Sequence, residues 1–349
     1  MKKVTIRSAL LVGALLVIII TVVLGRRLAL RDDEPKEPFS AESFRENAKV
    51  PAVAYAAIAR ERDVLLGADG PADANTTFEV ASIAKPLIAL SVLKLVDEGK
   101  LALDVDVSAF VGFGVKHPTD DTPITLRMLL THTSSIADDA MSAAPGGPPL
   151  DEFLRKYLAR SEAFSADGPG VKSVYSNVGP SLAALAVEVV EKTPFADWVK
   201  KHLFEPLGMK RTTYNVPLPP FAPPHAGMEK LASSSHALWP VVDLYSSAAD
   251  LTRFARAMLR GEILRPATRA MMFEEGLGWQ KRTIGGRSVS GHEGEDKGAS
   301  TGLYLDVSAG TGALFLANGD AFTSNDPTRA KALQDLLEAL LDAASRASP

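Results

Sequence analysis

The junction between a strand-like run, Thr77 to Ala81, and an apolar helical run that begins at Ser82 constrains this chain most. The apolar spacing of the second run predicts a helix that ends at Gly99. Lys85 follows Ser82 by three residues, and side chains at this spacing share one face of a helix. The sequence therefore predicts a serine hydroxyl and a lysine amine close together in the first turn of the helix, on the face that points toward the core.

This pair has the geometry of a serine nucleophile with a lysine base. The free N–H groups and the dipole of a first helical turn favour a developing oxyanion. A lysine that faces the core is desolvated, which lowers its pKa and allows it to act as a base. The alternative is an N-cap serine beside a lysine that extends to the surface. On this stretch alone, both interpretations stand.

Ser91 and Lys94 repeat the same spacing on the same predicted helix. At about 100° per residue, nine residues place Ser91 on the face opposite Ser82. Ser91, Lys94 and Glu98 then form a polar stripe, which is typical of a solvent-exposed face. We therefore expect this second pair to be a surface feature.

Composition restricts the class of protein. A chain of 349 residues with 46% hydrophobic side chains can bury a large core. The formal net charge of −4 gives no reason to expect a nucleic-acid partner. The absence of cysteine excludes disulfides, thiolate metal sites, a cysteine nucleophile and a lipid anchor on cysteine. No cofactor and no metal site is predicted.

The N-terminus predicts a membrane segment. Residues 8–25 carry no charge and are mostly Leu, Val, Ile and Ala, whereas Lys2, Lys3 and Arg7 precede them and Arg26 follows. This run is long for a signal-peptide core and has no small-x-small cleavage site, so we favour an uncleaved anchor over a removed signal peptide. We divide the chain into an anchor or signal segment (1–25), a linker (26–47) and one domain (48–349).

The pattern along the domain predicts an α+β fold. Strands are expected over 50–59, 64–66, 276–284, 287–292, 300–307 and 312–316, the third and fourth joined by a Gly285-Gly286 hairpin. Helices are expected over 124–131, 151–159, 180–191, 194–204, 247–259 and 327–347, with Thr125 as an N-cap. Strands at both ends of the domain and helices between them indicate one unit with a helical insertion at roughly 105–245. A long loop, 216–240, is expected to form a rim over a site.

Tyr175-Ser-Asn177 is the second candidate motif. It follows a Pro-Gly turn and precedes a helix, so Tyr175 and Asn177 would point the same way in an extended loop. Tyr175 could relay a proton if its pKa fell beside a cation such as Lys85. Asn177 could hold the carbonyl group of an amide or ester substrate. The alternative is an ordinary buried tyrosine beside an asparagine N-cap.

His292-Glu-Gly294 is the third candidate motif and lies at the end of a predicted strand. We expect Gly294 to let a substrate approach the backbone, and the N–H of Glu295 to be a second oxyanion donor beside that of Ser82. A histidine at a strand end is more often a surface residue. A functional role for this motif is therefore supported by its position after the other two motifs and not by its own pattern.

A serine at Ser300 offers a different reading. Gly298-Ala-Ser300-Thr-Gly302 matches the nucleophile elbow of α/β-hydrolases, which needs a strand, a turn and a helix in succession. The residues that follow, 303–307, continue as a strand. We therefore reject this reading.

The order of the three motifs resembles that of the serine β-lactamase-like hydrolases, the group of class C β-lactamases, D-alanyl-D-alanine carboxypeptidases and esterases. The likeness runs from about residue 48 to the C-terminus. It includes the phrases Glu98-Gly-Lys-Leu-Ala-Leu-Asp104, Ile124-Thr-Leu-Arg-Met-Leu-Leu-Thr-His-Thr-Ser134, Tyr175-Ser-Asn-Val-Gly179, Glu205-Pro-Leu-Gly-Met209, Ser247-Ala-Ala-Asp-Leu251 and Gly291-His-Glu-Gly294.

The resemblance implies Ser82 as the acylated nucleophile, Lys85 and Tyr175 as the proton-transfer pair, Asn177 as a substrate-orienting residue and His292 in the third motif. It also implies an antiparallel sheet flanked by helices, an all-helical lobe and a site between them. Because members of this group mostly act outside the cytoplasm, the domain is expected on the extracytoplasmic side of the membrane, or secreted if the N-terminal segment is cleaved.

Two departures from the family pattern bear on the prediction. Ser135 stands where the family usually has glycine after His-Thr-Ser, which affects a local turn. β-Lactamases of the group have Lys-Thr-Gly where this chain has His292-Glu-Gly, and a histidine near pH 7 is mostly neutral at its reference pKa of about 6.5. We therefore expect hydrolysis of an ester or amide, possible substrates being small acyl compounds, cell-wall peptides or β-lactams. The alternatives are true β-lactam turnover and a penicillin-recognising protein without turnover.

Overall fold

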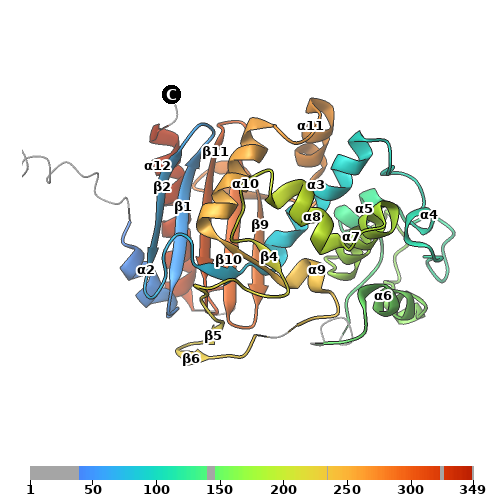
Figure 1. The fold of residues 1–349 in the computed structure, drawn as a ribbon, viewed down its shortest axis with the longest axis horizontal. Coiled ribbons are helices and arrows are strands. Elements are labelled where there is room, and N and C mark those ends of the chain that lie inside the picture. Colours follow the sequence, from blue (N-terminus) through green and yellow to red (C-terminus); the bar gives the residue numbers. More distant parts are fainter. Residues whose placement is uncertain (1–38, 140–145, 234, 323–325, 348–349) are drawn as a thin grey trace, which may run out of the picture. The chain divides into compact units, whose positions relative to one another are not determined.

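Strand β1 (Val53–Ala59) is buried along its whole length, although its side chains alternate between two faces. Ala54, Ala56 and Ile58 belong to one hydrophobic core, and Val53, Tyr55 and Ala57 belong to a second one on the other face. A strand that is apolar on both faces must lie in a sheet covered on both sides. The computed structural model, which describes residues 39–347 apart from 140–145, 234 and 323–325, contains such a sheet (Figure 1).

The sheet has six antiparallel strands in the order β2-β1-β11-β10-β9-β8. In chain order they are β1, β2 (Asp63–Asp69), β8 (Gln280–Ile284), β9 (Arg287–Asp296), β10 (Ala299–Asp306) and β11 (Thr311–Ala317). Val53 of β1 and Ser300 of β10 both pair with Ala317 of β11, so strands from the two ends of the domain are neighbours. The six predicted strands and the Gly285-Gly286 hairpin are thus confirmed, except that β8 starts four residues later than expected and β9 ends four residues later.

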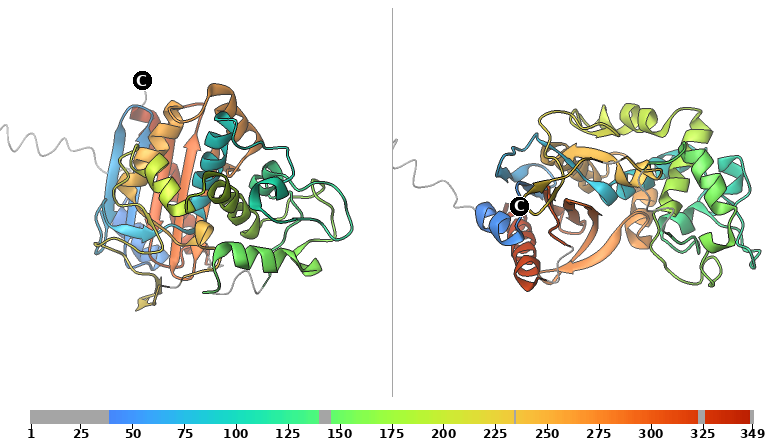
Figure 2. Two further views of the ribbon diagram at one scale, coloured as in Figure 1. Left: turned by 45° about the vertical axis from the view of Figure 1, so that its right-hand side comes forward. Right: turned by 90° about the horizontal axis from the view of Figure 1, so that it is seen from below.

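Helices cover both faces of the sheet. On one face, α2 (Ala41–Ala48) and α12 (Pro327–Ala347) pack with the core that includes Phe44, Tyr55 and Leu340. On the other face lie α3 (Ala84–Asp97) and α10 (Ala248–Arg260). Figure 2 shows from a second side that the sheet lies between these two helical layers.

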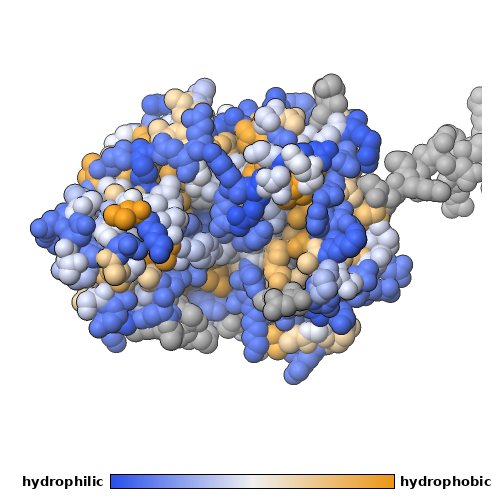
Figure 3. Space-filling view, turned by 180° about the vertical axis from the view of Figure 1, so that it is seen from behind, coloured by the Kyte–Doolittle hydropathy of each residue, from blue (hydrophilic) through white to orange (hydrophobic). Residues whose placement is uncertain are grey.

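Most of the remaining helices gather beside the sheet in a predominantly helical part (Figures 1 and 2). They are α4 (Ser108–Val111), α5 (Leu126–Leu130), α6 (Leu150–Leu158), the 3₁₀ turn η2 (Ser161–Ala163), α7 (Val178–Glu191), α8 (Phe195–Val199) with the π-helical turn η3 (Lys200–Phe204), and α9 (Trp239–Val242). This confirms the α+β class, with an antiparallel sheet and helices beside it. The space-filling view from behind shows a mostly hydrophilic surface that is hollowed near its middle (Figure 3).

Short elements connect the two parts. A small sheet has the order β3-β7-β4, formed by β3 (Thr77–Glu79), β7 (Leu244–Ser247) and β4 (Thr213–Tyr214), and a two-stranded one pairs β5 (His225–Ala226) with β6 (Glu229–Lys230). The 3₁₀ turn η1 (Ala81–Ile83) and the helix α11 (Pro266–Glu275) complete the chain. The sequence prediction missed β7 and α11.

Local capping explains several helix starts. Thr125 accepts a hydrogen bond from Met128 N at the start of α5, and Ser247 accepts one from Asp250 N at the start of α10. The predicted cap at Thr125 is confirmed, and the helix predicted to start at residue 247 has Ser247 as its N-cap. Ser135 has a φ of 63°, in the left-handed region that favours glycine, so the local turn forms with serine in place of glycine.

Two expectations need correction. Residues 41–47, the last part of the predicted linker, belong to α2, which Ser40 caps and which buries Phe44 against the sheet. Ser91 is fully buried, not solvent-exposed, because α3 is covered on nearly all sides. Its hydroxyl donates to the Leu87 carbonyl at 2.8 Å, which satisfies it inside the core. Lys94 and Glu98 are partly exposed, as expected.

The predicted membrane segment, 1–25, lies outside the described residues, as does the linker up to residue 38. Among the helices within the described part of the chain, none has the length and hydropathy that a membrane crossing requires.

Candidate active site

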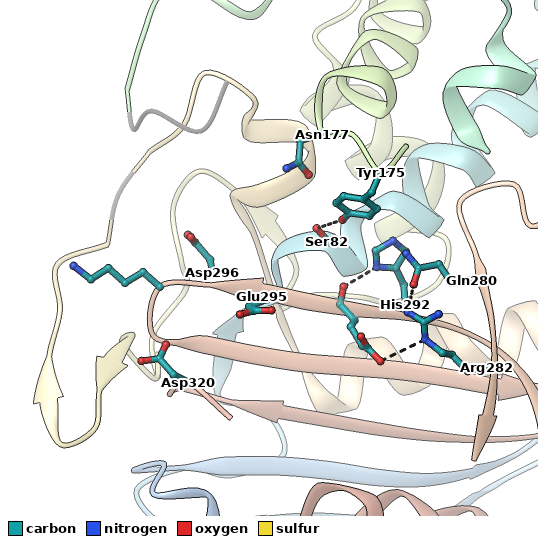
Figure 4. Close-up of a pocket in the computed structure, with 11 residues that line it drawn as sticks. Ser82, Tyr175, Asn177, Gln280, Arg282, His292, Glu295, Asp296 and Asp320 are labelled. Atoms are coloured by element: carbon teal, nitrogen blue, oxygen red, sulfur yellow. Dashed lines mark hydrogen bonds and ion pairs between the residues drawn. The ribbon is translucent and has the colours of Figure 1, made fainter. Parts of the chain in front are cut away.

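Ser82 lies in the turn η1, between the end of β3 and the start of α3. The residue before it, Ala81, has a φ of 45°, a conformation that costs an alanine of the order of 1–3 kcal/mol. This bend places the serine at the N-terminal end of α3 and at the edge of a cavity (Figure 4). No backbone hydrogen bond from the Ser82 N–H is found within the described residues, so this donor is available to an incoming oxygen.

The three motifs predicted from the sequence meet at this serine. Lys85 Nζ lies 2.6 Å from Ser82 Oγ and donates to Asn177 Oδ1 at 2.8 Å. The Tyr175 hydroxyl donates to Ser82 Oγ at 3.0 Å. Two groups able to exchange a proton with the Ser82 hydroxyl therefore contact the same oxygen, and Asn177 keeps its Nδ2 donor for a substrate carbonyl.

Lys85 is a buried lysine of low pKa. It is 1% exposed, and desolvation lowers its pKa to about 7, against the opposing effect of the Asp138 charge. A substantial fraction of its amine is therefore unprotonated at neutral pH and can accept the Ser82 proton. The prediction of a desolvated, inward-facing lysine is confirmed.

The pKa of Tyr175 is not lowered, although the sequence analysis made a lowered pKa the condition for a proton relay by this residue. Although this residue exposes 45% of its surface, desolvation raises the pKa of its phenol to about 12. Lys85 Nζ lies over the face of the Tyr175 ring, 4.8 Å from the centroid. Tyr175 is therefore a proton donor at neutral pH, and Lys85 is the better base.

Asp138 organises the Tyr175 motif, and the sequence analysis missed it. Its carboxylate accepts hydrogen bonds from Asn177 N at 2.8 Å, Ser176 Oγ at 2.9 Å and Val178 N at 3.2 Å. These donors lie at the N-terminus of α7, where a negative charge is favourable. The position of Asp138 shortly after His-Thr-Ser was the available signal, but nothing in the local pattern indicated a contact with residues 176–178.

The His132 ring packs against the ring of Tyr175. The two rings are 4.6 Å apart at an interplanar angle of 34°, and His132 Nδ1 accepts a hydrogen bond from Ser176 N. Burial and the Lys85 charge lower the pKa of His132 to about 4. It is therefore neutral at physiological pH and positions the tyrosine without adding a charge.

Gly294 is required for a different reason from the one expected. A Cβ atom here would lie 2.1 Å from the Val80 carbonyl oxygen and 2.3 Å from Thr301 Oγ1. Thr301 Oγ1 donates to that carbonyl at 3.0 Å, so β9 and β10 pack directly against the turn that carries Ser82. The glycine thus permits close packing of strand and turn, and the space beside it is filled by protein and not by substrate.

His292 is neutral and buried. It is 3% exposed, and burial together with the Lys85 charge lowers its pKa to about 3. Its Nδ1 atom lies 2.7 Å from the Glu293 carbonyl oxygen. The expectation that this histidine supplies no fixed cation is in accord with these surroundings.

The cavity beside Ser82 has a volume of about 690 Å³. Its lining contains five of the predicted residues, Ser82, Tyr175, Asn177, His292 and Glu295, and six that were not predicted: Gln280, Arg282, Glu293, Asp296, Lys297 and Asp320. Lys85 lies beneath Ser82, and Gly294 is covered as described above. The loop 216–240 was expected to form the rim, but none of its described residues lines this cavity.

A protonated carboxyl group lies behind the cavity. Glu79 is 6% exposed, and desolvation together with the adjacent Asp296 carboxylate raises its pKa to about 9. Asp296 is also 3.7 Å from His236 Nε2, and His236 Nδ1 is 2.6 Å from Asp243 Oδ1. This contact is how the loop 216–240 reaches the site.

The structure also bears on two other kinds of site, a nucleophile elbow at Ser300 and a metal site. Ser300 lies inside β10 and accepts hydrogen bonds from Ala321 N and Phe322 N, so the nucleophile-elbow reading fails as expected. Within the described residues, no group of three His, Cys, Asp or Glu side chains is placed to hold a metal ion.

Comparisons with known proteins agree with this geometry. The sequence model of the family described as Beta-lactamase matches residues 41–338. The D-alanyl-D-alanine-carboxypeptidase/endopeptidase AmpH of Escherichia coli is 28% identical over 204 residues, which cover 56% of this chain and 52% of that protein. Penicillin-binding protein 4* of Bacillus subtilis is 26% identical over 312 residues, covering 76% of this chain and 66% of that protein. The chain thus spans about half to two thirds of the length of these relatives.

Solved structures show the same fold. The D-amino acid amidase of Ochrobactrum anthropi, in complex with L-phenylalanine, superposes with a TM-score of 0.73 at 20% identity, over 86% of this chain and 98% of that one. The penicillin-binding protein homologue of Pyrococcus abyssi superposes with a TM-score of 0.70 at 22% identity, over 83% of this chain and 74% of that one.

The pKa of Lys85 predicts the pH dependence of nucleophile reactivity. The rate at which a serine-directed fluorophosphonate labels Ser82 should fall about tenfold per pH unit below about 7, because the base is then protonated. Asp138→Asn removes the charge that raises the Lys85 pKa, so this acid limb should move to lower pH. Asp139→Asn, at a residue that pairs with Arg160, is the matched control and should leave the limb in place. An unmoved limb in Asp138→Asn would contradict the electrostatic role of Asp138.

The buried carboxyl group of Glu79 predicts a pH-dependent stability. Its folded pKa of about 9 lies above the ordinary value of 4.5, so the folded state keeps a proton that the unfolded state loses between these pH values. The stability that Glu79 contributes is therefore complete below pH 4.5 and decreases as pH rises toward 9. Glu79→Gln imitates the protonated group and should raise the free energy of unfolding at pH 8 by a few kcal/mol.

Urea denaturation at pH 5 and pH 8 measures this effect. The gain from Glu79→Gln should be small at pH 5 and large at pH 8, whereas Glu162→Gln, at an exposed position, should change neither. Equal gains at both pH values would show that Glu79 is ionised in the folded protein.

Proposed function

The chain belongs to the Beta-lactamase family, and from this premise we propose that it is a serine hydrolase that cleaves ester or amide bonds through an acyl-enzyme on Ser82. The observation that carries the proposal is the contact of 2.6 Å between Ser82 Oγ and a buried Lys85 amine whose pKa is about 7. A lysine of this kind is a base of suitable strength for a serine hydroxyl at neutral pH.

Acylation follows from the contacts at Ser82. Neutral Lys85 accepts the hydroxyl proton as Oγ attacks the substrate carbonyl carbon. Tyr175 donates its hydroxyl proton to the leaving group as the tetrahedral intermediate collapses, and the Lys85 ammonium returns a proton to the phenolate. A water molecule then attacks the acyl-enzyme by the same route in reverse, with Ser82 as the leaving group.

Two backbone N–H groups stabilise the oxyanion. The Ser82 N–H lies at the start of α3, where the helix dipole favours negative charge. We assign the second donor to the N–H of Glu295 on β9, because Gly294 allows this strand to pack against the turn that carries Ser82. The Asn177 Nδ2 group orients the substrate carbonyl or amide from the other side of the cavity.

The substrate class is an ester, an amide or a peptide-like amide. Relatives that are named as a D-alanyl-D-alanine carboxypeptidase and a penicillin-binding protein support peptide or β-lactam recognition as candidates. A solved neighbour named as a D-amino acid amidase has the same fold. The neutral His292 disfavours efficient β-lactam turnover, because it offers no cation to the carboxylate of a penicillin.

We place the hydrolase domain outside the cytoplasm, held by the uncharged segment 8–25 as a single-pass anchor. The full-length chain should then sediment with membranes after an alkaline carbonate wash, and protease added to intact spheroplasts should degrade its domain. A soluble product that lacks residues 1–25 would indicate a cleaved signal peptide, and a protected domain would reverse the proposed orientation.

Ser82→Ala tests the mechanism directly. It should lower kcat/KM for a nitrophenyl ester by about a thousandfold or more, because the nucleophile is absent. Ser91→Ala is the matched control, since Ser91 repeats the spacing to a lysine on the same helix but lies in the core. It should keep ester turnover within a few-fold of wild type. Equal turnover by Ser82→Ala and wild type would disprove the mechanism.

The same proteins separate the activities. Labelling of Ser82 by fluorescent penicillin without release would favour a carboxypeptidase or a penicillin-recognising protein. Penicillin release at a steady rate would indicate a β-lactamase. Ester turnover without penicillin labelling would favour an esterase.

A further inference from the structure

Two acidic side chains link the segments that carry the proposed oxyanion donors. Glu79 is the last residue of β3, three residues before Ser82, and Asp296 is the last residue of β9, directly after Glu295. Figure 4 shows Asp296 beside Glu295 at the cavity. The Glu79 and Asp296 side chains are hydrogen-bonded to each other. One side-chain contact therefore joins the strand that leads to the Ser82 N–H and the strand that carries the Glu295 N–H.

This contact requires a proton. Carboxylate oxygens can only accept hydrogen bonds, so one of the two acids must be protonated. Glu79 is 6% exposed, whereas the Asp296 side chain is 26% exposed. Burial and the Asp296 charge raise the pKa of Glu79 to about 9, so Glu79 keeps the proton at neutral pH. It then donates to the ionised Asp296.

His236, from the loop 216–240, holds the same aspartate from another side. Its Nε2 atom lies 3.7 Å from Asp296 Oδ2, and its Nδ1 atom lies 2.6 Å from Asp243 Oδ1. Asp243 Oδ2 accepts a further hydrogen bond from His236 N at 2.9 Å. The Asp243 side chain is 1% exposed, and a buried carboxylate needs a cationic partner. The hydrogen bond with Asp243 and the charges of both aspartates raise the pKa of His236, against the effect of burial.

The other groups around Glu79 favour its neutral form. Glu79 pairs with Tyr245 of β7, and burial raises the pKa of that phenol, so Tyr245 is uncharged. The Asp243 charge raises the pKa of Glu79 in the same sense as the Asp296 charge. In the part of the chain that the structure describes, no ion pair includes Glu79. The contact between Glu79 and Asp296 is therefore a hydrogen bond of a neutral acid to a carboxylate that His236 compensates.

We propose that Glu79, Asp296 and His236 are positioning residues of the oxyanion site. They hold the end of β9 against the turn before α3, so that the N–H groups of Ser82 and Glu295 point at one oxygen atom. The inference rests on the proposed function, since that function assigns the two N–H groups to the oxyanion. The arrangement needs a neutral Glu79 and a charged His236, so the alignment is lost when either side chain loses its proton.

A matched pair of esters tests the proposal. A nitrophenyl ester and the corresponding thionoester differ in the atom that becomes the oxyanion, and sulfur is the weaker hydrogen-bond acceptor. The ratio of their kcat/KM values reports on the oxyanion donors, because a change in Ser82 or Lys85 reactivity affects both substrates alike. Glu79→Met removes the donor to Asp296 and should lower this ratio several-fold. Loss of a complete oxyanion donor costs about 10²–10³ in kcat, and misplacement of one costs less.

Three further variants locate the effect. His236→Gln removes the cation beside Asp296 and should lower the ratio in the same direction as Glu79→Met. Glu79→Gln is the conservative variant, because its amide still donates to Asp296, and should keep the ratio close to that of wild type. His202→Gln, at a histidine that contacts the Trp198 carbonyl, is the matched control and should leave the ratio unchanged.

The pH profile separates positioning from simple packing. In wild type the ratio should decrease as the pH rises toward 9, because Glu79 then loses the proton that it donates. Glu79→Gln keeps a donor at every pH and should lessen this decrease. A side chain that only fills space would leave the ratio independent of pH, and that result would contradict the proposal.

The proposal can fail independently of the hydrolase mechanism. An unchanged ratio in both Glu79→Met and His236→Gln would overturn it, even if both substrates are hydrolysed more slowly and wild type acts through Ser82. If Glu79→Met does not fold, the ratio in His236→Gln, at a side chain that is 12% exposed, decides the outcome. Ester turnover by Ser82→Ala at the rate of wild type would instead overturn the proposed function.

Discussion

The desolvation of Lys85 is the constraint on which the rest of the site depends. An amine that is 1% exposed loses the water that would stabilise its charge, and its pKa falls to about 7. The opposing charge of Asp138 keeps the pKa from falling further, and the same carboxylate holds the backbone of Asn177. Packing and one acidic side chain together therefore set both the strength of the base and the position of its partners.

The protonation states of the residues around Ser82 follow from this arrangement. Burial and the nearby Lys85 charge keep His132 and His292 neutral, with pKa values of about 4 and about 3. The pKa of Tyr175 is about 12, so its phenol holds its proton. Of the four groups, Lys85 is the one whose charge changes near neutral pH. A single base then faces Ser82, and neighbouring histidines do not compete with it for protons.

The local pattern predicted what depends on spacing along the chain. Helical phase brought Ser82 and Lys85 together, and strand alternation with glycine turns located the strands of the sheet. The local pattern did not predict the burial and the contacts that depend on tertiary packing. Ser91 looked like a surface residue until the helical part covered α3, Gly294 is needed because Val80 and Thr301 press against β9, and Asp138 contacts residues nearly forty positions away. Pro86 lies in the first turn of α3, which begins at Ala84, and the N–H that a proline lacks costs little there.

The two sides of the cavity differ in their electrostatic surroundings. One side is desolvated, and the other is lined by charged side chains. At Ser82 the protein removes water and charge, so that a neutral lysine can take a proton. On the side formed by β8, β9 and Asp320, the lining carries charged side chains of both signs: Arg282, Glu293, Glu295, Asp296, Lys297 and Asp320. Ser82 lines the cavity, whereas Lys85 is 1% exposed behind it, so a substrate can reach the serine without bringing water to the lysine. The pKa of Lys85 is therefore governed mainly by its burial, although charged side chains line the same cavity.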